Sequence, residues 1–317
     1  MHVPDGFLDA RTLVATAAAA SVGFGLALRA VRRHLPPRRV PLIGLTAAFV
    51  FAAQMLNFPV AAGTSGHLIG AALATVLLGP AAAVVAMTAV LLLQSLMFAD
   101  GGITALGANV LNLAVIAPLA AHGVYRVVRS AAGVGPQGTL LAAGVAAWCS
   151  TLAAALACAA QLAASGVVAW GTVLAAMGGV HMVIGLGEAV ITMLIVAVVM
   201  RARPELVMPA EPARATARGR TLAYGAALAI GSMVLVAPFA SPWPDGLEHV
   251  AERFGFASRA LAGQPAPLAD YTVTPLLDAS PWLATVIAGG IGALVAFAVA
   301  WFVARALAAP GRAGARH

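Results

Sequence analysis

Charged residues are scarce in this sequence. Only 9% of its 317 residues are Asp, Glu, Lys or Arg, whereas 62% are hydrophobic and the mean hydropathy is +0.95. A soluble globular domain carries about 25% charged residues. Because no arrangement of core and surface keeps so much apolar material from water, a soluble protein is excluded. We predict an all-α membrane protein that crosses the bilayer with several helices.

Lysine is absent, and all eighteen basic residues are arginine, which gives a formal net charge of +7. The arginines are not interleaved with aromatic residues on a polar face, so a nucleic-acid partner is not expected. Most of them flank apolar segments, as in the cytoplasmic loops of a protein embedded in membrane lipid: Arg29, Arg32, Arg33, Arg38, Arg39, Arg126, Arg129, Arg201, Arg203, Arg214, Arg218, Arg220, Arg305, Arg312 and Arg316.

Several motifs of enzymes are also missing. The sequence has no GxxxxGK[ST] loop for ATP and no HExxH pair for a catalytic metal. It has only two cysteines, Cys149 and Cys158, and nine residues place them on opposite faces of a helix, so no disulfide between them is expected. We therefore predict that the chain is not an enzyme and holds no catalytic cofactor.

The apolar residues form nine segments that we expect to cross the membrane. Residues 204–219 are rich in Pro and Arg and predict a linker, whereas residues 241–280 are polar and predict a loop between the last two segments. The third segment is short for a crossing of about 20 residues, but the positions of the later arginines favour its crossing. The approximate bounds are 12–31, 41–57, 67–78, 81–98, 104–125, 139–163, 173–200, 221–240 and 282–304.

One orientation fits these segments and the arginines. If the arginine clusters are cytoplasmic, the N-terminus and residues 241–280 lie outside the cell membrane and the C-terminus lies in the cytoplasm. Fifteen of the eighteen arginines are then inside, and only Arg11, Arg253 and Arg259 are outside. No convincing signal peptide precedes residue 30, and a bulky second residue disfavours removal of Met1. We therefore expect an intact N-terminus at the outer mouth of the bundle.

Met1 and His2 together form a potential chelate. The α-amine, the His2 amide nitrogen and an imidazole nitrogen can bind one ion in fused five- and six-membered rings, with one position of a square plane left open. Such nitrogen coordination favours Ni(II) or Cu(II), and Co(II) can also be accommodated. The fourth ligand is expected to be a histidine near the outer face. His67 is the best candidate among His34, His67, His122, His181, His249 and His317.

Other polar side chains in the apolar segments could support such a site. Asn109 and Asn112 share one helix face and could bond the inserted N-terminal loop, or serve as polar contacts between helices. His181 and Glu188 lie two turns apart and could orient the site or simply pair within the bundle. Gln94 could likewise support the site or simply make a polar contact within the bundle. Asp5 is interpreted as a turn residue.

Four stretches resemble the CbiM/NikM family, the substrate-capturing membrane subunits of energy-coupling-factor (ECF) importers. They are MHVPDGFLD, GTSGHLIGAALATVLLGP, LLLQSLMFADGGITALGANVLNLAV and GGVHMVIGLGEAVIT, in the family's order. The tail, with SPWPDGLEHVAERFGF, resembles the companion subunit CbiN/NikN. The resemblance implies three parts: a metal-capture domain over residues 1–203, a cytoplasmic linker over 204–219 and a PDGLE domain over 220–317.

The resemblance implies an architecture and a function. It implies a bundle of about seven helices, followed by two more helices that flank an outer loop. It implies that Met1, His2 and His67 hold the metal. The chain would be the substrate-specific component of an ECF-type ABC importer, which needs a separate transmembrane subunit and cytoplasmic ATPases. The tail favours cobalt over nickel as the transported ion. An ion-coupled secondary metal transporter is the alternative.

Overall fold

The computed structural model describes residues 1–60, 63–207, 231, 240–261, 265–273 and 280–308. Within these residues the chain is an almost entirely helical bundle, and six helical stretches are long and apolar enough to cross a membrane. The predicted all-α membrane fold is confirmed. Most of the eighth predicted segment, 221–240, and most of the predicted linker, 204–219, lie outside the described residues.

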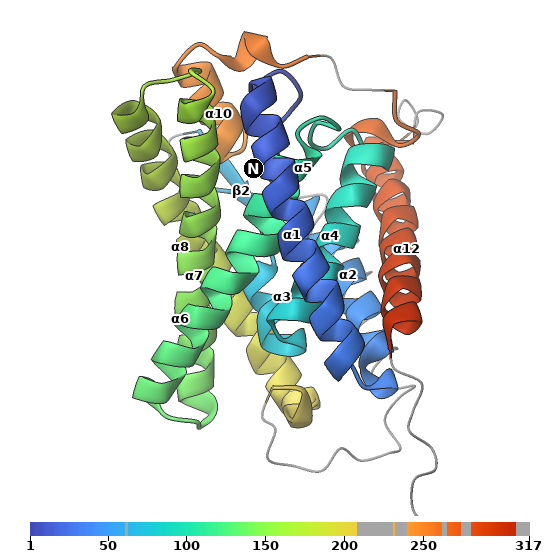
Figure 1. Cartoon of the computed structure of the whole chain (residues 1–317). Helices are drawn as coiled ribbons and strands as arrows, with labels where there is room; N and C mark the ends of the chain where they lie inside the picture. Colours follow the sequence, from blue (N-terminus) through green and yellow to red (C-terminus); the bar gives the residue numbers. More distant parts are fainter. Residues whose placement is uncertain (61–62, 208–230, 232–239, 262–264, 274–279, 309–317) are drawn as a thin grey trace, which may run out of the picture.

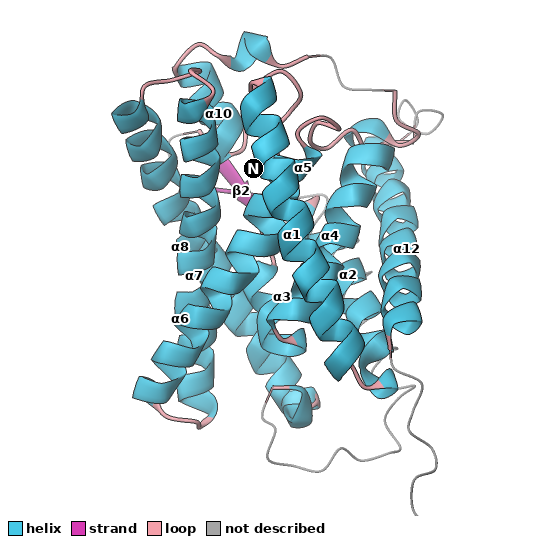
Figure 2. Cartoon of the chain, in the orientation of Figure 1, coloured by secondary structure: helices cyan, strands magenta, loops and turns pink. Residues whose placement is uncertain are grey.

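The helices follow the apolar segments closely (Figures 1 and 2). The α-helices are α1 Ala10–His34, α2 Val40–Gln54, α3 Ala71–Leu78, α4 Pro80–Met97, α5 Leu106–Asn109, α6 Ala117–Ala132, α7 Pro136–Ala164, α8 Trp170–Ala202, α10 Gly246–Arg253 and α12 Pro281–Leu307. Shorter helical turns are η1 Pro37–Arg39, the π-helix η2 Val110–Ile116, η3 Pro204–Leu206, η6 Ala257–Arg259 and η7 Ala269–Tyr271. The two strands are β1 Asn57–Pro59 and β2 Ser65–His67.

Capping residues explain several of these boundaries. Asp9 caps α1 by accepting a hydrogen bond from Thr12 N at 3.0 Å, as expected of Asp before a first turn. Pro80 and Pro136 occupy the first positions of α4 and α7, where a missing N–H costs nothing. Basic residues end α1, α6, α8 and α12, where the helix dipole favours positive charge.

The bundle has two chemically different ends. The last turns of α1, α6, α8 and α12 gather at the lower end of Figure 1, which we call the arginine end. Residues 1–9 and α10 lie at the opposite end, which we call the site end. The two parts of the site end are in contact: Leu261 N donates to Asp5 O at 2.9 Å, and the rings of Phe7 and Phe256 lie 5.2 Å apart.

The third predicted segment is wrong as a membrane-spanning helix. The strands β1 and β2 pair antiparallel, with Asn57 opposite His67, and α3 is only eight residues long, or about 12 Å. The helix begins after Gly70, whose φ of 77° no α-helix accommodates. His67 therefore lies in a strand, four residues before α3, rather than at the start of a helix.

The polar stretch after residue 240 is not an open loop. Leu247, Val250 and Ala251 of α10 are each 1% exposed, so this helix packs into the site end. The following helix, α12, runs along α2 with close backbone approach, since a Cβ added at Gly44 would lie 2.9 Å from Phe297 O. The C-terminal part of the chain is therefore packed directly on the bundle that precedes it.

Candidate metal centre

The first eight residues fold back into the site end. Met1, Val3 and Phe7 are 5%, 0% and 4% exposed, so these apolar side chains before the first helix are as buried as the core. Asn109 holds this segment by two hydrogen bonds: its Oδ1 accepts from Val3 N at 2.8 Å, and its Nδ2 donates to Val3 O at 3.1 Å. The structure thus brings Asn109 to the N-terminal loop.

Asp5 anchors the turn that follows. Its carboxylate accepts hydrogen bonds from the backbone N–H groups of Ile103, Thr104 and Ala105 at 3.2, 2.9 and 3.3 Å. These residues immediately precede α5, so the N-terminal turn and the start of α5 stabilise each other. The carboxylate is occupied by backbone donors, as expected of a turn residue.

The α-amine of Met1 is the centre of the candidate site. It lies 2.8 Å from Nε2 of His67 and forms an ion pair with the Asp245 carboxylate. Two nitrogen ligands at about 2.0 Å from one ion, at right angles, are about 2.8 Å apart. In the structure this contact is a hydrogen bond, and its length is also the spacing that two neighbouring ligands of a transition-metal ion would have.

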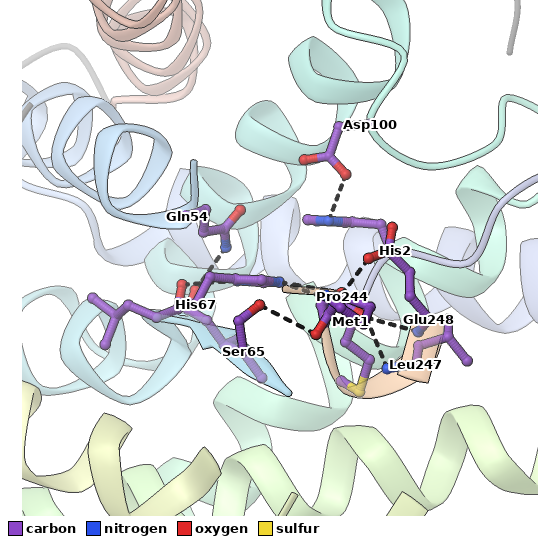
Figure 3. A network of polar contacts seen from close by, with 12 residues as sticks. Met1, His2, Gln54, Ser65, His67, Asp100, Pro244, Leu247 and Glu248 are labelled. Atoms are coloured by element: carbon purple, nitrogen blue, oxygen red, sulfur yellow. Dashed lines mark hydrogen bonds and ion pairs between the residues drawn. The ribbon is translucent and has the colours of Figure 1, made fainter. Parts of the chain in front are cut away.

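The His2 imidazole lies beside this pair (Figure 3). Its ring is parallel to that of His67, with the centroids 5.5 Å apart and an interplanar angle of 2°. Its Nδ1 lies 2.9 Å from Oδ1 of Asp100, and its buried Nε2 has no hydrogen-bond partner among the described residues. For Nδ1 of His2 to join the amine on one ion, the ring must leave Asp100.

Three helices hold the backbone beside His67. Glu188 of α8 accepts hydrogen bonds from Ile69 N at 3.1 Å and Gly70 N at 3.0 Å, and a third from the Thr151 hydroxyl of α7 at 2.8 Å. Gln54 of α2 donates to Ile69 O at 2.7 Å. Glu188 therefore holds two of the residues that join the strand carrying His67 to α3.

Burial and charge determine the protonation of these groups. Burial, together with the neighbouring amine, lowers the pKa of His67 from 6.5 to about 3, which keeps its imidazole neutral. Burial alone would lower the pKa of the Met1 amine, but the adjacent Asp245 raises it above its ordinary value of 8.0. Burial would raise the pKa of Asp245, but the amine holds it well below its usual range.

The C-terminal part contributes to this site directly. Ser65 of β2 donates from its backbone N to Pro244 O at 2.8 Å and from its hydroxyl to Trp243 O at 2.7 Å, and Ser241 N donates to Asn57 O at 2.8 Å. These bonds seat the next residue, Asp245, against the amine. The sequence does not predict Asp245 as a site residue, because Pro-Asp-Gly at 244–246 indicates only a turn. The one signal is that this acidic residue belongs to a loop expected on the same side of the membrane as Met1.

Two other predicted residues lie near the site in different roles. His181 is 2% exposed and lines a small cavity together with Met1, His67 and Asp245. Its Nδ1 lies 2.8 Å from Met177 O of the preceding turn. Gln94 lies on the side of the site that contains Asp100, where its Nε2 donates to the Tyr271 hydroxyl at 3.2 Å. That hydroxyl in turn donates to Asp100, the partner of His2.

Asn112 is not brought to the N-terminal loop. Its amide exchanges two hydrogen bonds with Gln161 of α7, at 2.9 and 2.6 Å. This reciprocal pair links η2 to α7 and matches the reading of a polar contact between helices. Of the other histidines considered, His34 ends α1 at the arginine end, whereas His317 lies outside the described residues.

A cavity of about 690 Å³ adjoins the site. His2, His67 and Gln54 contribute to its wall, and Gln54 presents a buried Oε1 with no hydrogen-bond partner among the described residues. Five carboxylates line the same cavity: Asp100, Asp245, Glu248, Glu252 and Asp270. A cavity with this lining favours cations over anions, and its negative charge raises the local concentration of divalent ions.

The fold and the site define a class: a multi-pass helical membrane protein that holds a buried cluster of nitrogen donors at one end. The family model described as the cobalt uptake substrate-specific transmembrane region, CbiM, matches residues 2–206. A second model, the PDGLE domain, matches residues 219–309. The chain belongs to the CbiM family of metal transport proteins, with a PDGLE domain in the same chain.

Relatives of known type share this organisation. The fused nickel transport protein NikMN of Rhodobacter capsulatus is 34% identical over 312 residues, covering 89% of each chain. The putative fused nickel transport protein NikMN of Archaeoglobus fulgidus is 34% identical over 313 residues, covering 96% of this chain and 98% of its own. A crystal structure of a truncated transition metal transporter is 34% identical, with a TM-score of 0.57, and covers 64% of this chain and 99% of its own. The predicted resemblance and the absence of enzymatic activity are confirmed.

Proposed function

We propose that this chain is the substrate-specific transmembrane component of an ECF-type ABC importer for nickel or cobalt. The observation that carries the proposal is the Met1 amine, buried and 2.8 Å from Nε2 of His67. The ion is held by the Met1 amine, the amide and imidazole of His2, and His67. The site end faces the outside of the cell membrane and the arginine end faces the cytoplasm, in accordance with the positive-inside rule.

ATP is hydrolysed by separate subunits in this proposal. The chain has no P-loop motif, so cytoplasmic ATPases and a second transmembrane subunit supply the energy for release. An ion-coupled secondary transporter would instead need ionisable residues along the path through the membrane. Within the described part of the candidate spans, the buried carboxylate is Glu188, and it is committed to backbone N–H groups and Thr151.

A competition experiment identifies the transported metal. The resemblance of the C-terminal tail favours cobalt as the transported ion. Two relatives that are fused proteins of the NikMN type are, however, named nickel transport proteins. The test is uptake of radioactive nickel and of radioactive cobalt, each competed by the other, in cells that express the chain with and without its ATPase partners. Uptake that persists without any ATPase partner would contradict the ABC-type proposal.

Replacing His67 by Ala is expected to weaken binding of nickel or cobalt by about a hundredfold, without abolishing it. Four ligands that share about 10–16 kcal/mol contribute about 3 kcal/mol each, and the amine–amide–imidazole set of Met1 and His2 remains. Isothermal titration of the purified variant measures the effect. His249→Ala, a histidine of α10 at the same end, is the control and should bind as the wild type does. Normal binding by His67→Ala combined with loss in His181→Ala would contradict the assignment.

Metal affinity is expected to keep rising as the pH increases beyond 8. The pKa of the Met1 amine lies above 8.0, so at neutral pH a metal ion must displace a proton from this nitrogen. His67, with a pKa of about 3, is neutral throughout the range and adds no dependence. Titrations on both sides of pH 8, in a buffer that does not bind metal, measure this slope. An affinity that is flat above pH 8 would show that the amine is not a ligand.

A further inference from the structure

The two oxygens of the Asp245 carboxylate have different partners. Oδ1 accepts hydrogen bonds from Leu247 N at 2.7 Å and Glu248 N at 3.0 Å, and so caps the start of α10. Oδ2 forms the ion pair with the Met1 amine and lies 3.9 Å from Nε2 of His67. One oxygen therefore anchors the residue, and the other faces two of the proposed metal ligands.

The spacing of these three atoms matches a ligand set. Neighbouring ligands at about 2.0 Å from one ion are about 2.8 Å apart, and opposite ligands are about 4 Å apart. The amine and His67 show the first distance, 2.8 Å, and Oδ2 and His67 nearly show the second, 3.9 Å. Because the amine is also in contact with Oδ2, a point about 2 Å from all three atoms lies nearly midway between Oδ2 and Nε2 of His67.

The Met1 amine, His67 and Asp245 already lie together in the structure, whereas the His2 imidazole is turned toward Asp100. Nδ1 of His2 is bonded to Asp100 and must move to reach an ion at this point, whereas Oδ2 of Asp245 is already in contact with the amine. One carboxylate oxygen with two nitrogens is an acceptable donor set for Co(II) and Ni(II). The loop that carries Asp245 is held on β2 through Ser65, so the carboxylate keeps its place beside His67.

We propose that Asp245 is itself a metal ligand, supplied by the C-terminal part of the chain. It binds the arriving Co(II) or Ni(II) together with the Met1 amine and His67. His2 then turns from Asp100 to the ion and takes over the position of Asp245. The inference rests on the proposed function, because it adds a ligand to the same site, and it makes the PDGLE part a participant in metal capture.

The test uses the full-length purified chain in which His2 is replaced by Ala. This change removes the imidazole and leaves the Met1 amine, His67 and Asp245 in place. Binding of Co(II) is followed by titration with its visible absorption spectrum. We expect weak binding by a mixed oxygen and nitrogen set. Adding Asp245→Asn should reduce that affinity by at least about tenfold, as is typical of groups that support a metal site.

Two features make the comparison specific. Asn keeps an oxygen for the cap of α10 and replaces the other oxygen by an NH₂ group, so the helix is expected to remain folded. Asp9→Asn, added to the same His2→Ala protein, removes an equal charge from another helix-capping Asp at the site end, and Asp9 does not line the cavity. This matched control should bind Co(II) as the His2→Ala protein does. Thermal unfolding of each variant checks that the bundle is intact.

Several outcomes would overturn the inference. These are equal Co(II) affinity with and without Asp245→Asn, an equal loss in the Asp9→Asn control, and no Co(II) binding by the His2→Ala protein at all. If Asp245→Asn unfolds the protein, Asp245→Ser in the same His2→Ala protein decides, because Ser can cap α10 without a carboxylate and an unchanged Co(II) affinity would exclude the ligand. Failure of the wild-type chain to bind either metal would instead contradict the proposed function.

Discussion

Replacing His2 by Ala is expected to lower the affinity for nickel or cobalt by at least about a hundredfold and to stop uptake. One average ligand of a four-ligand site contributes about 3 kcal/mol, and the loss of the imidazole also removes the six-membered chelate ring. Without the His2 imidazole, the Met1 amine and its neighbours bind the ion too weakly to hold it at trace concentrations. Titration of the purified variant and uptake of radioactive metal in cells measure the two effects.

The structure indicates that this variant keeps its fold. The His2 side chain is buried, and among the described residues its polar contact is with Asp100. The loop around it is held by Asn109, which accepts from Val3 N, and by the Asp5 carboxylate, which accepts from Thr104 N. His34→Ala, at the arginine end of α1, is the matched control and should transport normally. Wild-type affinity in a folded His2→Ala protein would contradict the proposed site.

Adding one or more residues before Met1 is expected to abolish uptake. The extension converts the α-amine into an amide, which cannot form the ion pair with Asp245 and is a far poorer ligand. It also adds about 3.5 Å of chain per residue in a place where Met1 is only 5% exposed. The new terminus could form a different chelate, but His2 would then be the third residue or later, at a distance from the terminal amine that the buried loop does not accommodate.

A tag placed after His317 is the control for this experiment and should leave uptake unchanged. Cell-surface labelling confirms that both tagged proteins reach the membrane, and mass spectrometry confirms that the N-terminal tag is uncleaved. Full uptake by the intact N-terminally extended protein would show that the terminal amine is not a ligand. It would leave the helical bundle and the family membership untouched, because these rest on other observations.

Local sequence was sufficient to predict most of the helices. An apolar run must satisfy its own backbone in a bilayer, and a helix does so within one segment, so the bounds of α1, α4, α7 and α8 follow from composition, proline and arginine. The failure at 67–78 has a specific cause. Gly70 and the two hydrogen bonds to Glu188 determine where α3 begins, and Glu188 is more than a hundred residues away in the chain.

The sequence by itself determined the membrane class, the helical fold and the prediction of a chelate at Met1 and His2, because each depends on neighbouring residues or on total composition. Only the tertiary structure decided which side chains surround that chelate. Asp245 reaches the amine across 244 positions, and Asp100 reaches His2 from the end of α4. No periodicity or spacing encodes contacts between segments so far apart. The contact of Asp245 arises from the packing of α10 and its preceding loop on the paired strands β1 and β2. That packing places a carboxylate from the C-terminal part against the first residue of the chain.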